Sequence, residues 1–200
     1  MSMTTLEDLL VEQVRDLYDA EKQLVRALPK IAEAAKWEDL QEAIRNHLEE
    51  TKNQVSRLER IFEELDKPAK GKACKAMRGL VEEGAGASKG KSEEPLTDLA
   101  IIAAAQRVEH YEISAYGTAR AIALQLGKEN IASLLEETED EEKAADMKLT
   151  DIAGDLMGQA GDGKGRTEVE KLPRKSTQAG ANSRRAARLE FDAKTVNQRL

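Results

Sequence analysis

Two glutamates stand on the apolar side of a predicted helix, where a carboxyl group is expensive to bury. Residues 103–117 read AAAQRVEHYEISAYG, and the apolar residues in and around this segment recur at steps of three and four. Glu109 and Glu112 lie one turn apart among those positions. Burial of an ionised carboxylate is costly unless a partner compensates its charge. The spacing therefore indicates a site that holds positive charge.

Carboxyl groups also interrupt the apolar stripes of three other predicted helices. Leucine and valine occupy most of the positions three, four and seven residues away from Glu21. Glu50 stands with His47 and Gln54 in the middle of a stripe that is otherwise aliphatic. Glu142 interrupts a fourth stripe near its centre. Because residues three and four apart share a helix face, these side chains are predicted to point toward the interior.

A set of buried carboxyl groups indicates metal ions. Carboxylates buried together repel one another, and bound cations remove that repulsion. Carboxylates that converge from four helices in a bundle core are a known way to hold two iron or manganese ions. A single inward-facing glutamate is more often exposed or ion-paired, but four of them in phase on four helices favour a metal site. The candidate ligands are Glu21, Glu50, Glu109, Glu112 and Glu142, with Glu139 and Asp146 placed either beside the site or on the surface.

The helices that must position these groups follow from apolar periodicity. Apolar residues with a period near 3.6 predict four long helices, over residues 5–35, 38–65, 96–126 and 129–156. Thr4 or Thr5 can cap the first helix, and Pro29 inside it predicts a kink or a nearby break. Short turns join the first two helices and the last two, so each pair is expected to form an antiparallel hairpin.

The connection between the hairpins, residues 66–95, is too long for a tight turn. A short helix is expected near residues 74–83, with Cys74 as a packing residue. A crossover of this length can run along a long helix. The predicted fold is therefore an all-α, ferritin-like four-helix bundle, made of two antiparallel hairpins joined by a long crossover with a short helix. The bundle is assigned to residues 3–157, and residues 158–200 form a basic C-terminal tail.

Charge and composition limit the classes of function. The net charge of −7 argues against general nucleic-acid binding by the whole chain. A single cysteine excludes an intrachain disulfide and a cysteine-based zinc site. The N-terminal residues MSMTTLEDLL do not resemble a signal peptide, and no apolar run is long enough to span a membrane. We therefore expect a cytoplasmic protein without a membrane segment.

The tail differs from the rest of the chain in charge. Residues 159–200 contain ten Lys or Arg and five Asp or Glu, so they carry about +5 while the remainder carries about −12. Without a sustained apolar face, this segment is expected to be a flexible, solvated tail. The alternative is an arm that contacts nucleic acid or an acidic surface, whose affinity would fall steeply with salt.

Five phrases in the sequence resemble the YciE/YciF-type stress proteins, a branch of the ferritin-like superfamily. They occur in the same order over residues 3–157 and read LYDAEKQLVRALPKIAEAA, HLEET, CKAMRGLVEEG, AAAQRVEHYEISAYGTA and LLEETEDEEKAADMKLTDIA. The resemblance implies a ferritin-like bundle, a homodimer, a location in the bacterial cytoplasm and a role in stress responses. It does not define a reaction.

The sequence departs from the wider superfamily at two positions. There the second and fourth helices usually supply Glu-x-x-His, but Asn53 follows Glu50 and Ala145 follows Glu142 at that spacing. His47 could replace one of the missing histidines. Gln54 is a second candidate for that role.

The resemblance also implies roles for the candidate ligands. By analogy with the superfamily, Glu50 and Glu142 would bridge two ions, and Glu21, Glu109 and Glu112 would hold them at the ends. A site rich in oxygen and poor in nitrogen suits hard ions such as iron and manganese, and also magnesium or calcium.

Two functions remain open on the sequence alone. The first is a di-metal carboxylate protein of the stress response with ferroxidase- or peroxidase-like activity. The second is a non-enzymatic, dimeric stress or scaffold protein, in which water and cations such as Arg107 and Lys143 compensate the carboxylates. The sequence does not decide whether the protein is an enzyme.

Overall fold

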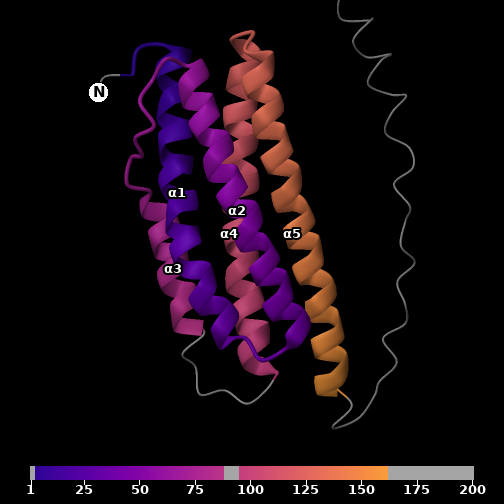
Figure 1. The fold of residues 1–200 in the computed structure, drawn as a ribbon. Coiled ribbons are helices and arrows are strands. Elements are labelled where there is room, and N and C mark those ends of the chain that lie inside the picture. The colour runs from indigo at the N-terminus through magenta and orange to yellow at the C-terminus, as the bar shows by residue number, and fades with distance from the viewer. Residues whose placement is uncertain (1–2, 88–94, 162–200) are drawn as a thin grey trace, which may run out of the picture. The chain divides into compact units, whose positions relative to one another are not determined.

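The bundle consists of two helical hairpins and one crossover helix. The computed structural model describes residues 3–87 and 95–161, and within these ranges it contains helices and loops only. The helices are α1 (Leu6–Ala34), α2 (Glu38–Glu64), α3 (Lys75–Ala87), α4 (Leu96–Gln125) and α5 (Glu129–Gly161) (Figure 1). The predicted hairpins, α1–α2 and α4–α5, and the short helix in the crossover between them are confirmed.

Local signals define the helix ends. Thr5 caps α1 with a reciprocal capping box, in which the Asp8 amide donates to Thr5 Oγ1 and the Thr5 amide donates to Asp8 Oδ2, both at 3.0 Å. Gly127 follows α4 with a φ of +68°, and the Lys128 amide donates to the Ala123 carbonyl at 2.9 Å. This is a Schellman ending, which requires the left-handed conformation that glycine adopts without strain.

Pro29 does not end α1. The helix continues to Ala34, although proline lacks the N–H for one helical hydrogen bond. Leu28 and Ala32, on either side of Pro29, are buried. Burial of this apolar face compensates the lost bond, and the helix ends five residues later than a break at the proline would place it.

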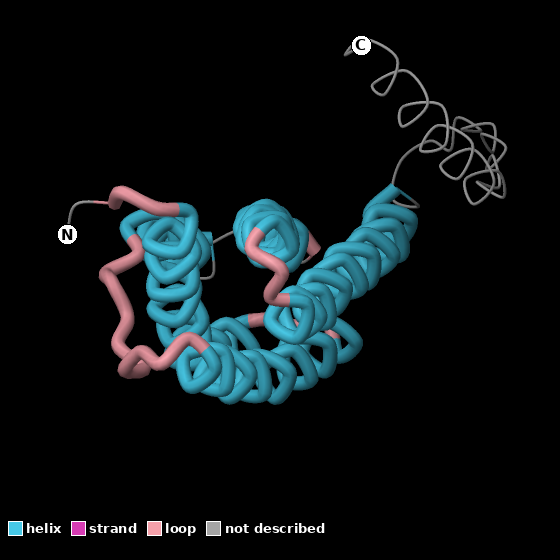
Figure 2. Tube along the Cα trace, turned by 90° about the horizontal axis from the view of Figure 1, so that it is seen from above, coloured by secondary structure: helices cyan, strands magenta, loops and turns pink. Residues whose placement is uncertain are grey.

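The crossover lies against α1 and α4. The Lys72 amide donates to the Arg15 carbonyl, and Arg15 Nε donates to the Lys70 carbonyl, each at 3.0 Å. The Cys74 amide donates to Asp19 Oδ2 at 2.8 Å. These bonds attach the crossover to α1 immediately before α3, which runs beside α1 and α4 (Figures 1 and 2). Cys74 itself is a buried free thiol, as a packing residue would be.

Two apolar clusters fill the bundle, one toward each end. The first is contributed by residues 10–18 of α1, 58–65 of α2, 116–123 of α4 and 131–135 of α5. The second is contributed by residues 20–32 of α1, 40–44 of α2, 101–108 of α4 and 149–156 of α5. The buried polar residues of α2, α4 and α5 lie mostly between these stretches. The bundle therefore has one polar layer between two apolar cores.

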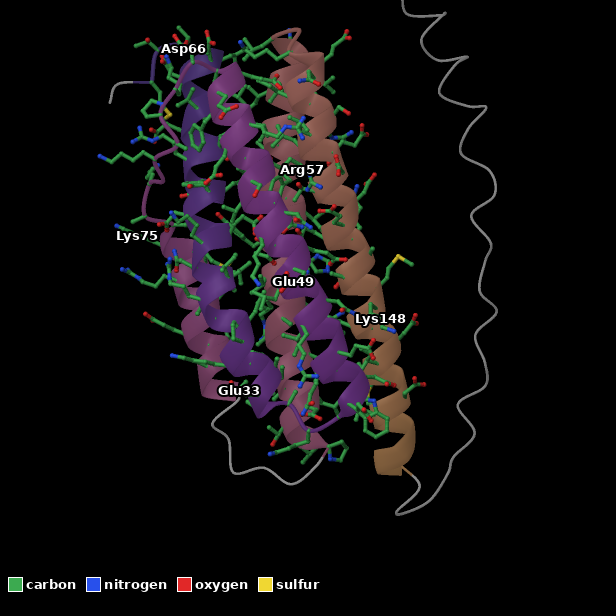
Figure 3. The ribbon with its side chains drawn as sticks, in the orientation of Figure 1. Glu33, Glu49, Arg57, Asp66, Lys75 and Lys148 are labelled. Carbon is green, nitrogen blue, oxygen red and sulfur yellow. The ribbon has the colours of Figure 1, made fainter. Side chains whose placement is uncertain are left out.

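The outer surface carries ordinary solvated charges. Glu33, Glu49 and Lys75 are exposed and project from the outside of the helices (Figure 3). No helix in the described ranges combines the length and the apolar character that a membrane crossing requires.

Asp98 links the two hairpins. This side chain lies on the first turn of α4 and is 2% exposed. It accepts hydrogen bonds from the backbone amides of Lys36 at 3.0 Å and Trp37 at 2.7 Å, in the turn between α1 and α2. Trp37 is the N-cap of α2 and makes no side-chain capping bond of its own. A residue of the second hairpin thus fixes the turn that leads into α2 of the first.

Asp98→Ala should therefore destabilise the bundle. We expect the free energy of unfolding to fall by about 1–3 kcal/mol, because two partly buried amide hydrogen bonds lose their charged acceptor. Urea denaturation of the variant measures this change. Asp155→Ala, on the exposed side of α5, serves as the control and should change stability by less than about 0.5 kcal/mol. Equal effects of the two substitutions would show that Asp98 does not stabilise the bundle through this turn.

Candidate metal centre

Four buried side chains meet in the polar layer. His47 of α2, Glu109 and Glu112 of α4 and Glu142 of α5 each offer a ligand atom, and these atoms lie within 4.8 Å of one another. Ligands on opposite sides of a small divalent cation are about 4 Å apart, because each bond is about 2.1 Å long. The group is therefore compact enough to surround an ion without a large rearrangement.

Glu21 of α1 extends the cluster. Its side chain is fully buried, and Oε1 accepts a hydrogen bond from the hydroxyl of Tyr116. Its other oxygen has no hydrogen-bond partner among the described residues. The carboxyl groups of Glu112 and Glu142 are close enough to repel that of Glu21. All four long helices thus contribute to the layer.

Many polar atoms of the layer lack a partner. Within the described ranges, no hydrogen bond reaches either oxygen of Glu112, either nitrogen of His47, or one carboxyl oxygen each of Glu109 and Glu142. Buried polar atoms are nearly always paired in folded proteins. Their concentration in one place makes the layer a group that could hold a metal ion.

Little positive charge reaches the layer from the protein itself. His47 Nε2 lies 3.7 Å from Glu109 Oε1 and 3.9 Å from Glu142 Oε2, which is too long for a hydrogen bond. Among the ion pairs of the described residues, none joins a lysine or arginine to Glu21 or to the three glutamates of the compact group. Arg107 and Lys143 pair instead with glutamates and an aspartate nearer the surface.

These surroundings shift the proton equilibria. Burial, together with repulsion from Glu142, raises the pKa of Glu21 to about 8. Burial and repulsion from Glu21 raise the pKa of Glu109 to about 8. The pKa values of Glu112 and Glu142 lie well above the ordinary range, again chiefly because of burial. Without added cations, these carboxyl groups tend to remain protonated.

His47 responds in the opposite sense. Burial alone would lower its pKa, but the neighbouring carboxyl groups of Glu50, Glu142 and Glu21 outweigh that effect and raise it. Among the described residues of the cluster, the His47 imidazole is therefore the one group that can carry a positive charge.

Gln54 connects the cluster to a buried arginine. Gln54 Nε2 donates to Glu142 Oε1 at 2.5 Å and to Glu141 Oε2 at 3.0 Å. Arg57 holds Glu141 through two parallel bonds of 2.9 Å and also donates to Thr138 at 2.6 Å. The chain from Arg57 through Glu141 to Gln54 fixes one oxygen of Glu142 and leaves the other free.

Sequence reasoning missed Arg57, although a signal was present. Arg57 is 8% exposed and lies three residues after Gln54 and four before Ile61, both on the buried stripe of α2. That spacing places its side chain at the edge of the same face.

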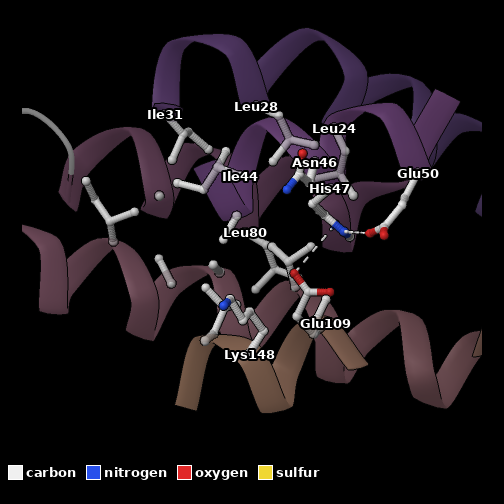
Figure 4. A pocket seen from close by; sticks show the side chains of 18 of the residues that line it. Leu24, Leu28, Ile31, Ile44, Asn46, His47, Glu50, Leu80, Glu109 and Lys148 are labelled. Carbon is white, nitrogen blue, oxygen red and sulfur yellow. Dashed lines mark ion pairs between the residues drawn. The ribbon is translucent and has the colours of Figure 1, made fainter. Parts of the chain in front are cut away.

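The structure does not bring every candidate ligand into the layer. The side chain of Glu50 is 49% exposed and lies 3.6 Å from His47 Nδ1, on the side of the imidazole away from Glu109 (Figure 4). The buried face of α2 passes through His47, Thr51 and Gln54, so Glu50 falls one position off that face.

Glu139 and Asp146 also lie outside the compact group. Glu139 is 7% exposed but pairs with Arg120 at 2.9 Å and Lys143 at 2.8 Å. Asp146 is partly exposed and accepts a hydrogen bond from Gln106 Nε2 at 3.0 Å. Both have cationic or amide partners, so neither needs an ion to satisfy it.

The comparisons with known proteins identify relatives over the described helices. The family model with the description "Domain of unknown function (DUF892)" matches residues 5–161. Protein YciF of Escherichia coli K12 is 47% identical over 154 residues, which make up 76% of this chain and 93% of that protein. These matches confirm the resemblance to YciE/YciF-type proteins.

Solved structures agree with the fold. The crystal structure of the E. coli stress protein YciF matches with a TM-score of 0.76 and 46% identity, over 78% of this chain and 99% of that one. YcfI from Rhodopseudomonas palustris matches with a TM-score of 0.72 and 43% identity, over 74% and 95% of the two chains. A Xanthomonas campestris protein shares the fold with a TM-score of 0.63 and 19% identity, over 78% and 96%.

The raised pKa values predict how stability depends on pH without metal. Between about pH 5 and 8 the folded protein keeps protons on Glu21 and Glu109 that the unfolded chain releases. Because the folded state then binds more protons, stability should fall as the pH rises through this window. The raised pKa of His47 acts in the same direction.

Urea denaturation at pH 5, 6.5 and 8 in the presence of a chelator measures this dependence. Glu109→Gln should reduce the slope, whereas Glu49→Gln, on the exposed surface, should leave it unchanged. A stability that rises from pH 5 to pH 8 in the chelated protein would contradict the assigned proton equilibria.

Proposed function

This chain belongs to the DUF892 family, and from that premise we propose that it is a ferritin-like protein that binds two iron or manganese ions. The observation that carries the proposal is the set of buried carboxyl oxygens and imidazole nitrogens without partners in the polar layer. When these carboxyl groups are ionised and no cation is bound, they repel one another. Cations in the layer would replace that repulsion with attraction.

The donor atoms suggest how the ions are shared. His47, Glu109, Glu112 and Glu142 are close enough together to hold one ion. Glu21, whose second oxygen has no hydrogen-bond partner among the described residues, would add a further carboxylate donor, and the carboxylates would share a second ion with it. Four carboxyl groups and one imidazole form an oxygen-rich set, which suits iron and manganese better than soft metals.

Iron or manganese in this layer would supply redox chemistry toward peroxide or oxygen, as a ferroxidase or peroxidase requires. The chain's own residues would support that chemistry in three ways. The hydroxyl of Tyr116 holds a proton next to Glu21. Gln54 keeps Glu142 in one orientation. The apolar clusters limit the access of water along the bundle axis.

The relative named a stress protein supports a stress-related role for this chain. We extend that role to it as part of the proposal, together with a homodimeric state and a cytoplasmic location. Residues 158–161, assigned to the basic tail from the sequence, continue α5 instead. The remainder of the tail lies outside the described residues, and its contact with nucleic acid or acidic surfaces stays a prediction.

A non-enzymatic role remains the second candidate, because specific positions favour it. Asn53 and Ala145 occupy the places where the wider superfamily usually has histidine, and Glu50 is half exposed. Under this alternative the layer would stay protonated and metal-free. Replacing glutamate by glutamine in the layer would then stabilise the bundle without changing any response to metal.

Metal binding should stabilise the purified full-length protein. At a free Mn²⁺ concentration 100 times the dissociation constant, we expect a gain of about 2.7 kcal/mol, which raises Tm by roughly 5–10 °C. Glu112→Gln should abolish most of this shift because it removes a ligand oxygen. Elemental analysis of protein purified without added metal provides an independent measurement.

Glu136→Gln provides the matched control, since Glu136 is exposed on the same helix as Glu142. It should retain the full shift. If neither Mn²⁺ nor Fe²⁺ changes Tm and elemental analysis finds no metal, the second candidate replaces the first.

Peroxide turnover tests the enzymatic part of the proposal separately. Protein loaded with Fe²⁺ or Mn²⁺ should consume hydrogen peroxide faster than the same ions free in solution. Glu142→Gln should lower the rate at least tenfold, and Glu136→Gln should leave it unchanged. If the protein binds metal but does not consume peroxide, the metal site stands and the proposed peroxidase activity is wrong.

A further inference from the structure

An apolar cavity of about 310 Å³ lies within the bundle, beside the polar layer (Figure 4). All five helices contribute to its wall. Its wall combines aliphatic side chains such as Leu24, Leu28 and Ile44 with several alanines and with Gly84 of α3. Small residues at these positions leave the space open. A larger side chain at any of them would fill part of it.

The cavity is open to solvent on one side but extends among core side chains of the bundle, where so large a space is unusual. Cores pack to nearly crystalline density, and cavities larger than a water molecule are few in a domain. A cavity with apolar walls gives water too few hydrogen-bond partners to hold it in place. The main volume is therefore suited to an apolar occupant rather than to a cluster of ordered waters.

One end of the cavity reaches the candidate metal centre. His47 and Glu109, which belong to the compact group, also line the cavity, as does Glu50 (Figure 4). An occupant would therefore have its apolar body among the aliphatic residues and one end beside these polar side chains. Small-molecule sites commonly combine an apolar wall with a few polar groups at one end.

The cavity opens between α2 and α5. Its exposed lining residues are Asn46 and Glu50 on α2 and Ala144 and Lys148 on α5, whereas the residues from the other helices are buried or half-buried. A molecule can therefore enter from solvent without passing through the layer of carboxyl groups.

We infer that this cavity binds an uncharged small molecule with a hydrocarbon body, of up to about 12 non-hydrogen atoms in all. An apolar cavity of about 150 Å³ binds benzene, so about 310 Å³ has room for roughly twice as many atoms. Glu50 and Glu141 lie on the wall outside the compact group. Their carboxylates can accept a hydrogen bond from a hydroxyl or a similar neutral donor but would repel an anionic end.

The inference concerns a ligand other than the metal ion and does not require the ion to be bound. The test therefore uses the metal-free full-length protein with a chelator present. Isothermal titration with 1-octanol should show one binding site and a negative heat-capacity change, the signature of apolar burial. Octanoate, which has the same chain length but a negative charge, should bind at least tenfold more weakly.

Two substitutions fill the cavity from different helices. Ala104→Leu acts from α4 and Ala43→Leu from α2, and both residues line the wall. Each should weaken 1-octanol binding at least tenfold, with Tm unchanged or raised. Ala103→Leu is the matched control, because the neighbouring side chain on α4 is exposed and should leave binding unchanged.

Three results would overturn the inference. The first is that the wild-type protein does not bind 1-octanol. The second is that both filled variants bind 1-octanol as tightly as the wild-type protein does. The third is that octanoate binds more tightly than 1-octanol. The last would assign recognition to the lysine at the mouth. Failure of the protein to bind Mn²⁺ would leave the octanol result unaffected, so this test and the test of the metal centre fail separately.

Discussion

Four carboxyl groups without a counter-charge stand between two apolar cores, and the surrounding structure is arranged around that constraint. Glu21, Glu109, Glu112 and Glu142 come from three helices, and His47 comes from the fourth. Each residue would be costly at its position if it were charged and alone. The apolar clusters above and below prevent the carboxyl groups from reaching solvent by a small movement. Either bound protons or bound cations can remove the repulsion in the layer. The stability of the bundle should therefore depend on both the pH and the metal concentration.

The polar residues around the layer restrict which of its atoms remain available. Tyr116 occupies one oxygen of Glu21, and Gln54 occupies one oxygen of Glu142. Arg57 pairs with Glu137 and Glu141 rather than with the compact group, and it reaches that group through Glu141 and Gln54. Arg57 therefore helps to orient the Glu142 carboxyl group but does not neutralise the buried carboxyl groups. Such an arrangement favours an external cation, because the protein's own cations are already paired.

Apolar periodicity was sufficient to predict most of the fold. It placed the four long helices to within a few residues, since caps such as Thr5 and stops such as Gly127 are readable signals. It also identified Glu21, Glu109, Glu112 and Glu142 as inward-facing, because each has apolar neighbours one turn away on both sides. The bundle architecture followed from the lengths of the connections.

The contribution of α2 was harder to predict, for a physical reason. His47, Glu50, Thr51 and Gln54 are all polar, so the sequence does not show which of them continue the apolar stripe. Packing against α1 and α5 decides that His47, Thr51 and Gln54 face inward and that Glu50 remains at the edge. Arg57 illustrates the same limit, since a buried arginine depends on partners from α5 that are distant in the sequence.

The crossover helix has a consequence for how such proteins can diversify. Of its residues α3 buries only Met77 and Gly84, yet Leu80, Val81 and Gly84 form one wall of the cavity. Substitutions in α3 can thus alter the shape of that wall while the four long helices and their carboxyl layer remain intact. Homologous bundles could acquire new ligand preferences through substitutions in α3 alone, with little loss of stability in the four long helices.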